Sequence, residues 1–264
     1  MINEILLIIS LAFIMELIDS SLGLGYGTIL SPLFIIIFEN EPSVVIPSIL
    51  LSQTISGSLA GFFHNRFENV SFKMKKYSWI ENIKKGFTID LRIVFLISFF
   101  GILFTIIGAF LTLHIPLIIL KVYISLSVFW IGILIFTKKQ FIFSWKKIFL
   151  FGAIATFNKG FMGGGFGPIL TGGQILSGQK EKSAIGCTTL AEGPVCLTGF
   201  FAYLVMNNIQ GSILNFLIPM LIGSCLAAPF GAIITKKINH KMLRHTVSFL
   251  MILLGIGTFI KIWI

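Results

Sequence analysis

Two glycine-rich stretches interrupt long apolar segments. Residues 19–27 read Asp-Ser-Ser-Leu-Gly-Leu-Gly-Tyr-Gly, and residues 158–168 read Asn-Lys-Gly-Phe-Met-Gly-Gly-Gly-Phe-Gly-Pro. A helix that begins after such a turn offers free N–H donors and a partial positive charge, which favour an anion. The alternative is that glycine only lets helices pack closely. We expect two turns that bind a small anion, through Gly25, Tyr26, Gly27, Thr28, Gly164, Gly165, Phe166 and Gly167.

Polar side chains on the helices after the two turns could add hydrogen bonds to the anion. The candidates are Ser48, Gln53 and Thr188. Ser and Thr hydroxyls could equally bond to carbonyls of their own helix. Glu192 lies in an apolar run, and a carboxylate at bilayer depth is a functional hypothesis by default. It could carry the proton of a proton-coupled cycle, or it could only form a protonated hydrogen bond between helices.

Asp19 and Lys159 occupy matching places, one before each glycine turn. Lys159 could attract the anion, or it could simply neutralise an acid. We therefore regard the two residues as candidate charge partners.

Composition restricts the class of protein. Of the 264 residues, 56% are hydrophobic and 11% are charged, and the mean hydropathy is +0.97. Soluble domains have about 25% charged residues, so this is an integral membrane protein, and nucleic-acid binding is a poor interpretation of the net charge of +10. The chain has no zinc-protease, serine-hydrolase or phosphate-loop motif. We expect no enzyme, no metal and no cofactor; the expected partners are the bilayer and a small anion.

Six apolar runs have the length of a membrane-spanning helix, about 20 residues. They are Val44–Phe63, Ile93–Leu113, Ile115–Phe136, Ser183–Met206, Ile213–Thr235 and Leu243–Ile264. Two longer segments, Glu4–Phe38 and Ile148–Ser177, contain the glycine turns. Each of these predicts a helix, an irregular turn and a shorter second helix; a single kinked span is the alternative.

The chain repeats itself. A shift of 140 positions places Gly23, Gly25 and Gly27 on Gly163, Gly165 and Gly167. We therefore divide the chain into two transmembrane repeats, residues 1–137 and 147–264. Basic residues gather in the loops 64–92, 137–147 and 236–241, which should face the cytoplasm. All three do so only if each glycine-broken segment enters and leaves on one side. The predicted fold is an all-α polytopic membrane protein with two inverted repeats, each a glycine-broken helical hairpin plus three transmembrane helices.

The duplicated turns, Gly23-Leu-Gly-Tyr-Gly27 and Gly163-Gly-Gly-Phe-Gly-Pro168, each followed by a helix with Ser or Thr, resemble the sulfite exporter TauE/SafE family. The resemblance covers nearly the whole chain except loop 64–92. It implies transport of sulfite, organosulfonates or similar sulfur-containing anions across the inner membrane, with coupling to protons. A channel or a membrane protein without transport activity is the alternative, although inverted repeats favour a carrier.

Overall fold

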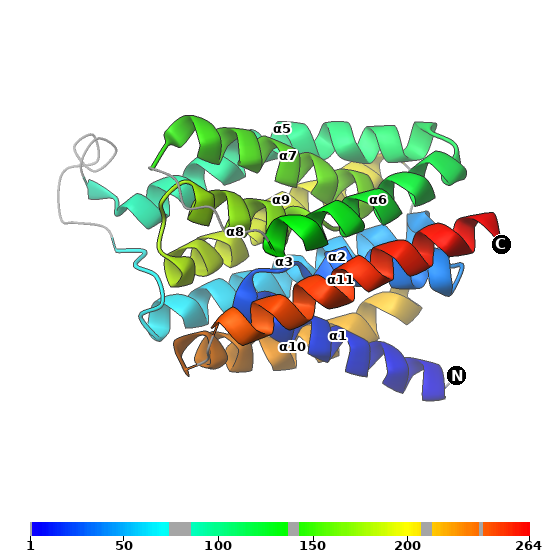
Figure 1. Cartoon of the computed structure of the whole chain (residues 1–264), viewed down its shortest axis with the longest axis horizontal. Coiled ribbons are helices and arrows are strands. Elements are labelled where there is room, and N and C mark those ends of the chain that lie inside the picture. Colours follow the sequence, from blue (N-terminus) through cyan, green and yellow to red (C-terminus); the bar gives the residue numbers. More distant parts are fainter. Residues whose placement is uncertain (1, 74–85, 137–142, 207–212, 238–239) are drawn as a thin grey trace.

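A computed structural model of the chain describes residues 2–73, 86–136, 143–206, 213–237 and 240–264. Helices form nearly all of this part of the chain (Figure 1). In order, they are α1 (Ile2–Leu22), α2 (Tyr26–Pro32), the π-helix η1 (Leu33–Ile37), α3 (Pro42–Arg66), α5 (Ile89–His114), α6 (Leu117–Phe136), α7 (Trp145–Met162), α8 (Phe166–Leu176), α9 (Glu181–Val205), α10 (Ile213–Lys237) and α11 (His240–Trp263). The all-helical fold is confirmed, and a helix lies at each of the six predicted crossings.

Glycine ends the first arm of each broken segment. Gly23 and Gly25 have φ values of 65° and 83°, and their equivalents Gly163 and Gly165 have values of 70° and 76°. This left-handed region is costly for residues with a Cβ atom. Pro168 lies in the first turn of α8, where its missing N–H costs no helical hydrogen bond. The alternative of a single kinked span is therefore wrong for both segments.

The two broken segments open toward opposite ends of the molecule. In Figure 1, α1 begins and η1 ends at the end that carries both chain termini, whereas α7 begins and α8 ends at the other end. The second arm α8 has 11 residues, or roughly 16 Å at 1.5 Å per residue. That length is about half of a bilayer's ~30 Å hydrocarbon core.

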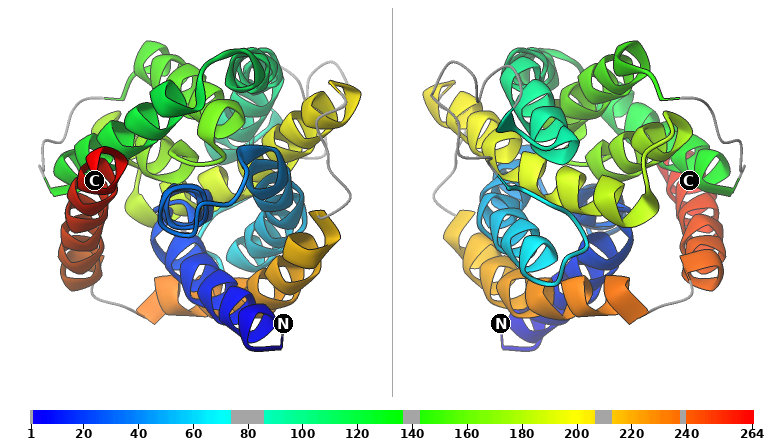
Figure 2. Two further views of the ribbon diagram at one scale, coloured as in Figure 1. Left: turned by 90° about the vertical axis from the view of Figure 1, so that its right-hand side faces the viewer. Right: turned by 90° about the vertical axis from the view of Figure 1, so that its left-hand side faces the viewer.

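The helices pack in pairs that join one half of the chain to the other. α1 lies along α10, α5 along α7, α3 along α9, and α6 along α11 (Figure 2). α3 also packs against α10, and α9 packs against α5. The sequence repeat predicts that α1, α3, α5 and α6 correspond to α7, α9, α10 and α11, and exchanging the helices in this way leaves this set of contacts unchanged.

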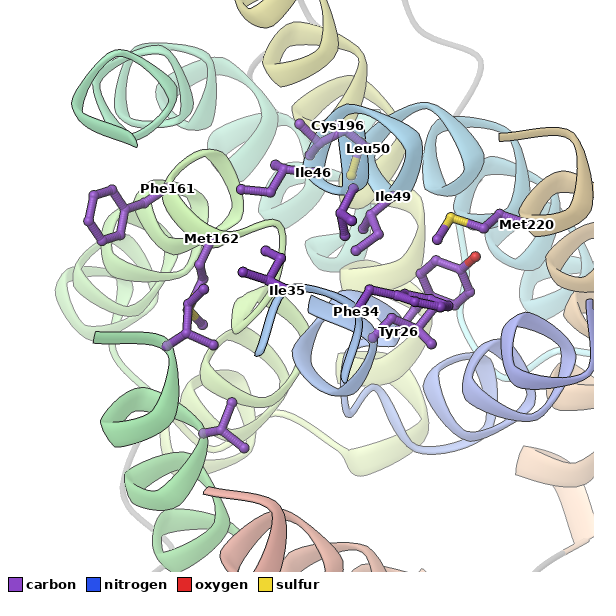
Figure 3. Close-up of a cluster of buried hydrophobic side chains, with 14 of the residues drawn as sticks. Tyr26, Phe34, Ile35, Ile46, Ile49, Leu50, Phe161, Met162, Cys196 and Met220 are labelled. Carbon is purple, nitrogen blue, oxygen red and sulfur yellow. The ribbon is translucent and has the colours of Figure 1, made fainter. Parts of the chain in front are cut away.

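Apolar residues cover the outside of the bundle. Large side chains such as Phe99, Trp130 and Phe230 are more than half exposed, as expected for helices that face lipid. Among the described residues, α1, α3, α5, α9 and α10 are long and apolar enough to cross a membrane. Inside, the first hairpin packs against α3 and α10: Figure 3 places Tyr26 and Phe34 beside Ile49 and Met220.

The two ends of the molecule differ in charge. We call one the basic end, because it carries Arg66, Lys73, Lys146, Lys147, Lys180, Lys182, Lys236 and Lys237. The other is the acidic end, with Glu39 and Glu41 in the turn before α3. The part of loop 64–92 from 74 to 85 and residues 137–142, with several of the lysines that predict orientation, lie outside the described residues.

Candidate functional site

The two glycine turns lie directly against each other inside the molecule. A Cβ atom on Gly164 would lie 2.7 Å from the carbonyl carbon of Gly27, and one on Gly27 would lie 2.8 Å from that of Gly163. Real Cβ atoms are not found at such distances from a backbone carbon. The backbones of the two hairpins therefore cross without side chains between them.

At the first turn, a carboxylate of the protein accepts a hydrogen bond from a backbone N–H group. The N–H of Gly25, which precedes α2, donates to Oδ1 of Asp19 over 2.7 Å. The other carboxylate oxygen accepts from Nε2 of Gln53 on α3 over 3.0 Å. A negative group is favourable beside the first residues of a helix. Asp19 thus stands where an anionic ligand of this turn would have to bind.

At the second turn, the equivalent donor has a neutral partner. The N–H of Gly165 donates to Oγ1 of Thr28 on the opposite hairpin over 2.9 Å. Lys159 occupies the place of Asp19 and cannot accept a hydrogen bond. Its Nζ instead lies 5.9 Å from the centroid of the Phe166 ring, at the start of α8. The amine therefore lies near the side chain of the first residue of α8.

Lys159 is the cation of a buried network. Its Nζ donates to Oε1 of Glu192 over 2.7 Å and to Oε1 of Gln53. Nε2 of Gln53 also donates to Oε1 of Glu192 over 2.8 Å, and to Asp19 as described above. None of these side chains is more than 1% exposed. Gln53 therefore connects the charged residues of α1, α7 and α9.

A third acid lies beside this network. Oε2 of Glu16, on α1, accepts a hydrogen bond of 3.0 Å from Ser56 of α3. Glu16 is 2% exposed. Oε2 of Glu192 has no hydrogen-bond partner among the described residues. Three carboxyl groups and one amine thus share the interior, and they would carry a net charge of −2 if all were ionised, which is costly away from water.

The structure brings together only some of the residues that the sequence singles out. Gln53, Glu192, Asp19 and Lys159 form the network with the turn residues around them. Ser48 donates to the carbonyl of Val44 in its own helix over 2.7 Å, which is the alternative given for it. Tyr26 accepts a bond of 3.4 Å from Ser52.

Thr188 lies in a separate group of polar side chains. It accepts hydrogen bonds from Thr171 over 2.9 Å and from Gln174 over 2.8 Å. The sequence reasoning missed both partners, although they share a face of α8 at a spacing of three residues. The thiol of Cys196 is a further group beside Lys159.

Metal binding finds no support in the geometry of the described residues. No group of three or more His, Cys, Asp and Glu side chains there could hold an ion. The groups that the site offers are the amine of Lys159, the amide of Gln53 that bonds to it, and the carboxyl groups of Asp19 and Glu192, which can gain or lose a proton.

Comparison with known proteins assigns the family. The model of the family described as "Sulfite exporter TauE/SafE" matches residues 74–258. The chain belongs to this family. The match includes α7, α8 and α9, and therefore Lys159 and Glu192, whereas the first hairpin precedes it. TauE/SafE proteins are membrane transporters, which agrees with the exposed apolar helices and the buried charges.

A bacterial relative matches most of the chain. The protein named "Probable membrane transporter protein YtnM", of Bacillus subtilis (strain 168), is 25% identical over 263 residues, which cover 94% of this chain and 80% of the relative. No solved structure matches the chain.

Proposed function

We propose that this TauE/SafE protein is a secondary transporter of a small sulfur-containing oxyanion, of the sulfite or organosulfonate class, across the cytoplasmic membrane, with protons as coupling ions. The observation that supports it is the buried amine of Lys159 at the second glycine turn. Its hydrogen-bond acceptors are an amide and a carboxylate. An oxyanion offers the same kind of acceptor as that carboxylate, so the two can exchange.

Proton coupling follows from this competition. A protonated Glu192 holds Lys159 less strongly than a carboxylate does, because a charge-assisted hydrogen bond is roughly twice as strong as a neutral one. A proton on Glu192 therefore releases Lys159 to the anion, and the two ligands bind together. The second oxygen of Glu192, which has no partner among the described residues, is available for this proton.

Alternating access requires two halves that can rock about the site. The repeats that we propose, residues 1–137 and 147–264, are inverted relative to each other. The opposite openings of the hairpins and the exchangeable helix pairs support this arrangement. Inverted repeats with broken helices at the midplane are a recurrent plan of secondary transporters. The basic end would face the cytoplasm.

Flux into proteoliposomes tests the proposal. The assay offers sulfite, sulfate, thiosulfate, sulfoacetate and taurine, with and without a pH gradient. We expect saturable uptake of one of the sulfur oxyanions and acceleration by protons on the side of uptake. Absence of uptake of all five by folded protein would exclude the substrate class, and uptake that does not saturate would indicate a channel.

Glu192→Gln tests the coupling separately. The amide keeps an oxygen for Lys159 but cannot carry a proton. We expect exchange of internal for external anion to continue, while acceleration by the pH gradient is lost. Glu4→Gln, at an exposed position at the start of α1, is the matched control and should keep the acceleration. If Glu192→Gln keeps it too, another group carries the proton.

A further inference from the structure

A cavity of about 920 Å³ opens at the basic end, between the end of α3, the start of α5 and the start of α9. Four basic residues line it, Arg66, Lys73, Lys180 and Lys182, against three acidic ones, Glu68, Asp90 and Glu181, so the lining has a small excess of positive charge. Positive side chains around a concave surface raise the local concentration of anions. The cavity is a suitable entrance for an anion on its way to the glycine turns.

Asp90, also in the lining, is occupied by hydrogen bonds from the protein. Its carboxylate accepts from the N–H of Ser71 over 3.0 Å, from Nε2 of Gln179 over 3.2 Å and from the hydroxyl of Ser183. Asp90 therefore joins the start of α5 to the start of α9 and to the turn after α8. These hydrogen bonds hold the three segments together at the inner side of the proposed entrance.

Behind Asp90, polar side chains continue toward the centre. Gln174 donates to Thr188 over 2.8 Å, and Thr171 donates to the same hydroxyl over 2.9 Å. All three are at most 3% exposed. Thr171 ends against the first glycine turn, where a Cβ on Gly23 would lie 3.0 Å from its Cγ2. We name the set Asp90, Ser183, Gln179, Gln174, Thr188 and Thr171 the polar file.

The polar file is incompletely satisfied within the protein. The side-chain oxygens of Gln174 and Gln179 are buried and have no hydrogen-bond partner among the described residues. Such groups destabilise the fold when they stay unpaired, and in native structures they call for an explanation. Water or a protonated oxyanion that passes along the file would supply the missing donor. Neutral hydroxyls and amides can bind a passing ion without trapping it.

The equivalent positions in the first half are less polar. The shift of 140 places Gln174 on Phe34 and Thr171 on Ser31. Phe34 packs edge-on against Phe216 of α10, with ring centroids 5.5 Å apart. Aromatic rings thus occupy the place on the acidic side that an amide occupies on the basic side. Among the described residues, Phe34 therefore makes the position on the acidic side that matches Gln174 apolar.

We propose that the polar file is the basic-end half of the substrate path, through which an oxyanion moves between the cavity and the glycine turns. This inference rests on the proposed function for the identity of the anion, but the placement of the path can be tested without flux. Gln174 and Thr188 are the residues that contact the passing anion.

Cysteine accessibility tests the path. Thr188→Cys is made in a background with Cys187, Cys196 and Cys225 replaced by Ala, and it is treated with an anionic, membrane-impermeant methanethiosulfonate. Membrane vesicles of both orientations are used. Lys146→Cys, exposed at the start of α7, marks the face on which the basic end lies. We expect Thr188→Cys to react from that same face only.

Thr198→Cys is the matched control on the same helix. Its hydroxyl bonds to the carbonyl of Pro194 over 2.8 Å, away from the polar file, and it should react from neither face. Reaction of Thr188→Cys from neither face, or from the opposite face, would overturn the path. Reaction from the expected face without flux of any sulfur anion would refute the substrate class and leave the path intact.

The transport rate of variants with and without an added negative charge in the polar file is a second test. Gln174→Glu places a carboxylate on the route, and Gln174→Met removes the amide without adding charge. We expect the acidic variant to transport about tenfold more slowly than the neutral one, which corresponds to ~1.4 kcal/mol in the barrier. Equal rates for the two variants would show that the anion does not pass Gln174.

Discussion

The two glycine turns share their backbone conformation and differ in charge. Gly25 and Gly165 both have φ near 80°, and each lies six residues after a buried ionisable side chain. In the first turn that residue is Asp19, which binds the N–H of its own turn. In the second it is Lys159, which turns to Glu192 and leaves the N–H to Thr28.

This difference suggests that the two glycine turns have different roles although their backbones are similar. The first turn is closed by a carboxylate of the protein, so an external anion would have to displace it. The second presents an amine and a helix that begins beside it. We therefore propose that the anion binds at the second turn and that the first has a structural or competing role.

Removal of the amine should have the largest effect. Lys159→Met leaves the carboxyl groups around it without a cation, and breaking a buried ion pair costs about 3–5 kcal/mol. We expect saturable flux to disappear and the unfolding temperature in detergent to fall clearly. Lys159→Met combined with Glu192→Gln should recover stability but not flux. If the single variant transports at the normal rate, Lys159 does not take part in binding the anion.

Adding a methyl group at each glycine turn allows a direct comparison of the two turns. Gly165→Ala and Gly25→Ala both force a residue with a Cβ into the left-handed region, at a cost of about 1–2 kcal/mol. The new atom of Gly165→Ala would lie 2.6 Å from Cε of Met162, whereas that of Gly25→Ala would overlap Oγ1 of Thr28 and lie 2.9 Å from Cδ of Pro168. We expect Gly165→Ala to raise the KM for the anion more.

The control for this pair is Gly172→Ala on α8, because a Cβ there meets no atom within 4 Å. It should leave both KM and the unfolding temperature unchanged. If Gly25→Ala raises KM more than Gly165→Ala does, the anion binds at the first turn and the assignment is reversed.

The smallest effect is expected at the closed turn. Asp19→Asn keeps an oxygen for the N–H of Gly25 but brings an amide N–H toward Nε2 of Gln53, so Gln53 must reorient. Loss of such a hydrogen bond costs about 1 kcal/mol. A modest fall in unfolding temperature should accompany a change in the KM of the anion, because Gln53 also holds Lys159.

Glu16→Gln provides the comparison for stability, since its amide oxygen can still accept from Ser56. It should unfold within a degree or two of the wild type. An equal loss of stability in both variants would mean that any neutralised acid loosens the interior and that Asp19 has no particular link to Gln53.

The fold could be predicted because its signals are local. Lengths of apolar runs predict the crossings, and glycine pairs with their positive φ predict where α1 and α7 end. Pro168 correctly predicts a helix start. These features depend on neighbouring residues and on the thickness of the bilayer, so a single sequence contains them.

The site could be predicted only in part, because its contacts join distant segments. Asp19, Gln53, Lys159 and Glu192 stood out as polar residues in apolar runs, yet nothing local indicates that Gln53 connects the other three. The network depends on how α3 packs between α1 and α9. Likewise, Gln174 resembles any polar residue near a helix end until α8 folds against α9.

The crossing of the glycine turns also constrains how the molecule can move. Because the backbones of Gly27 and Gly164 touch, no layer of rotatable side chains lies between the hairpins to absorb a relative displacement. A tilt of one hairpin must push the other, so the crossing acts as a fulcrum between them. A small shift at this fulcrum is converted into a wider swing at the ends of α2 and α8.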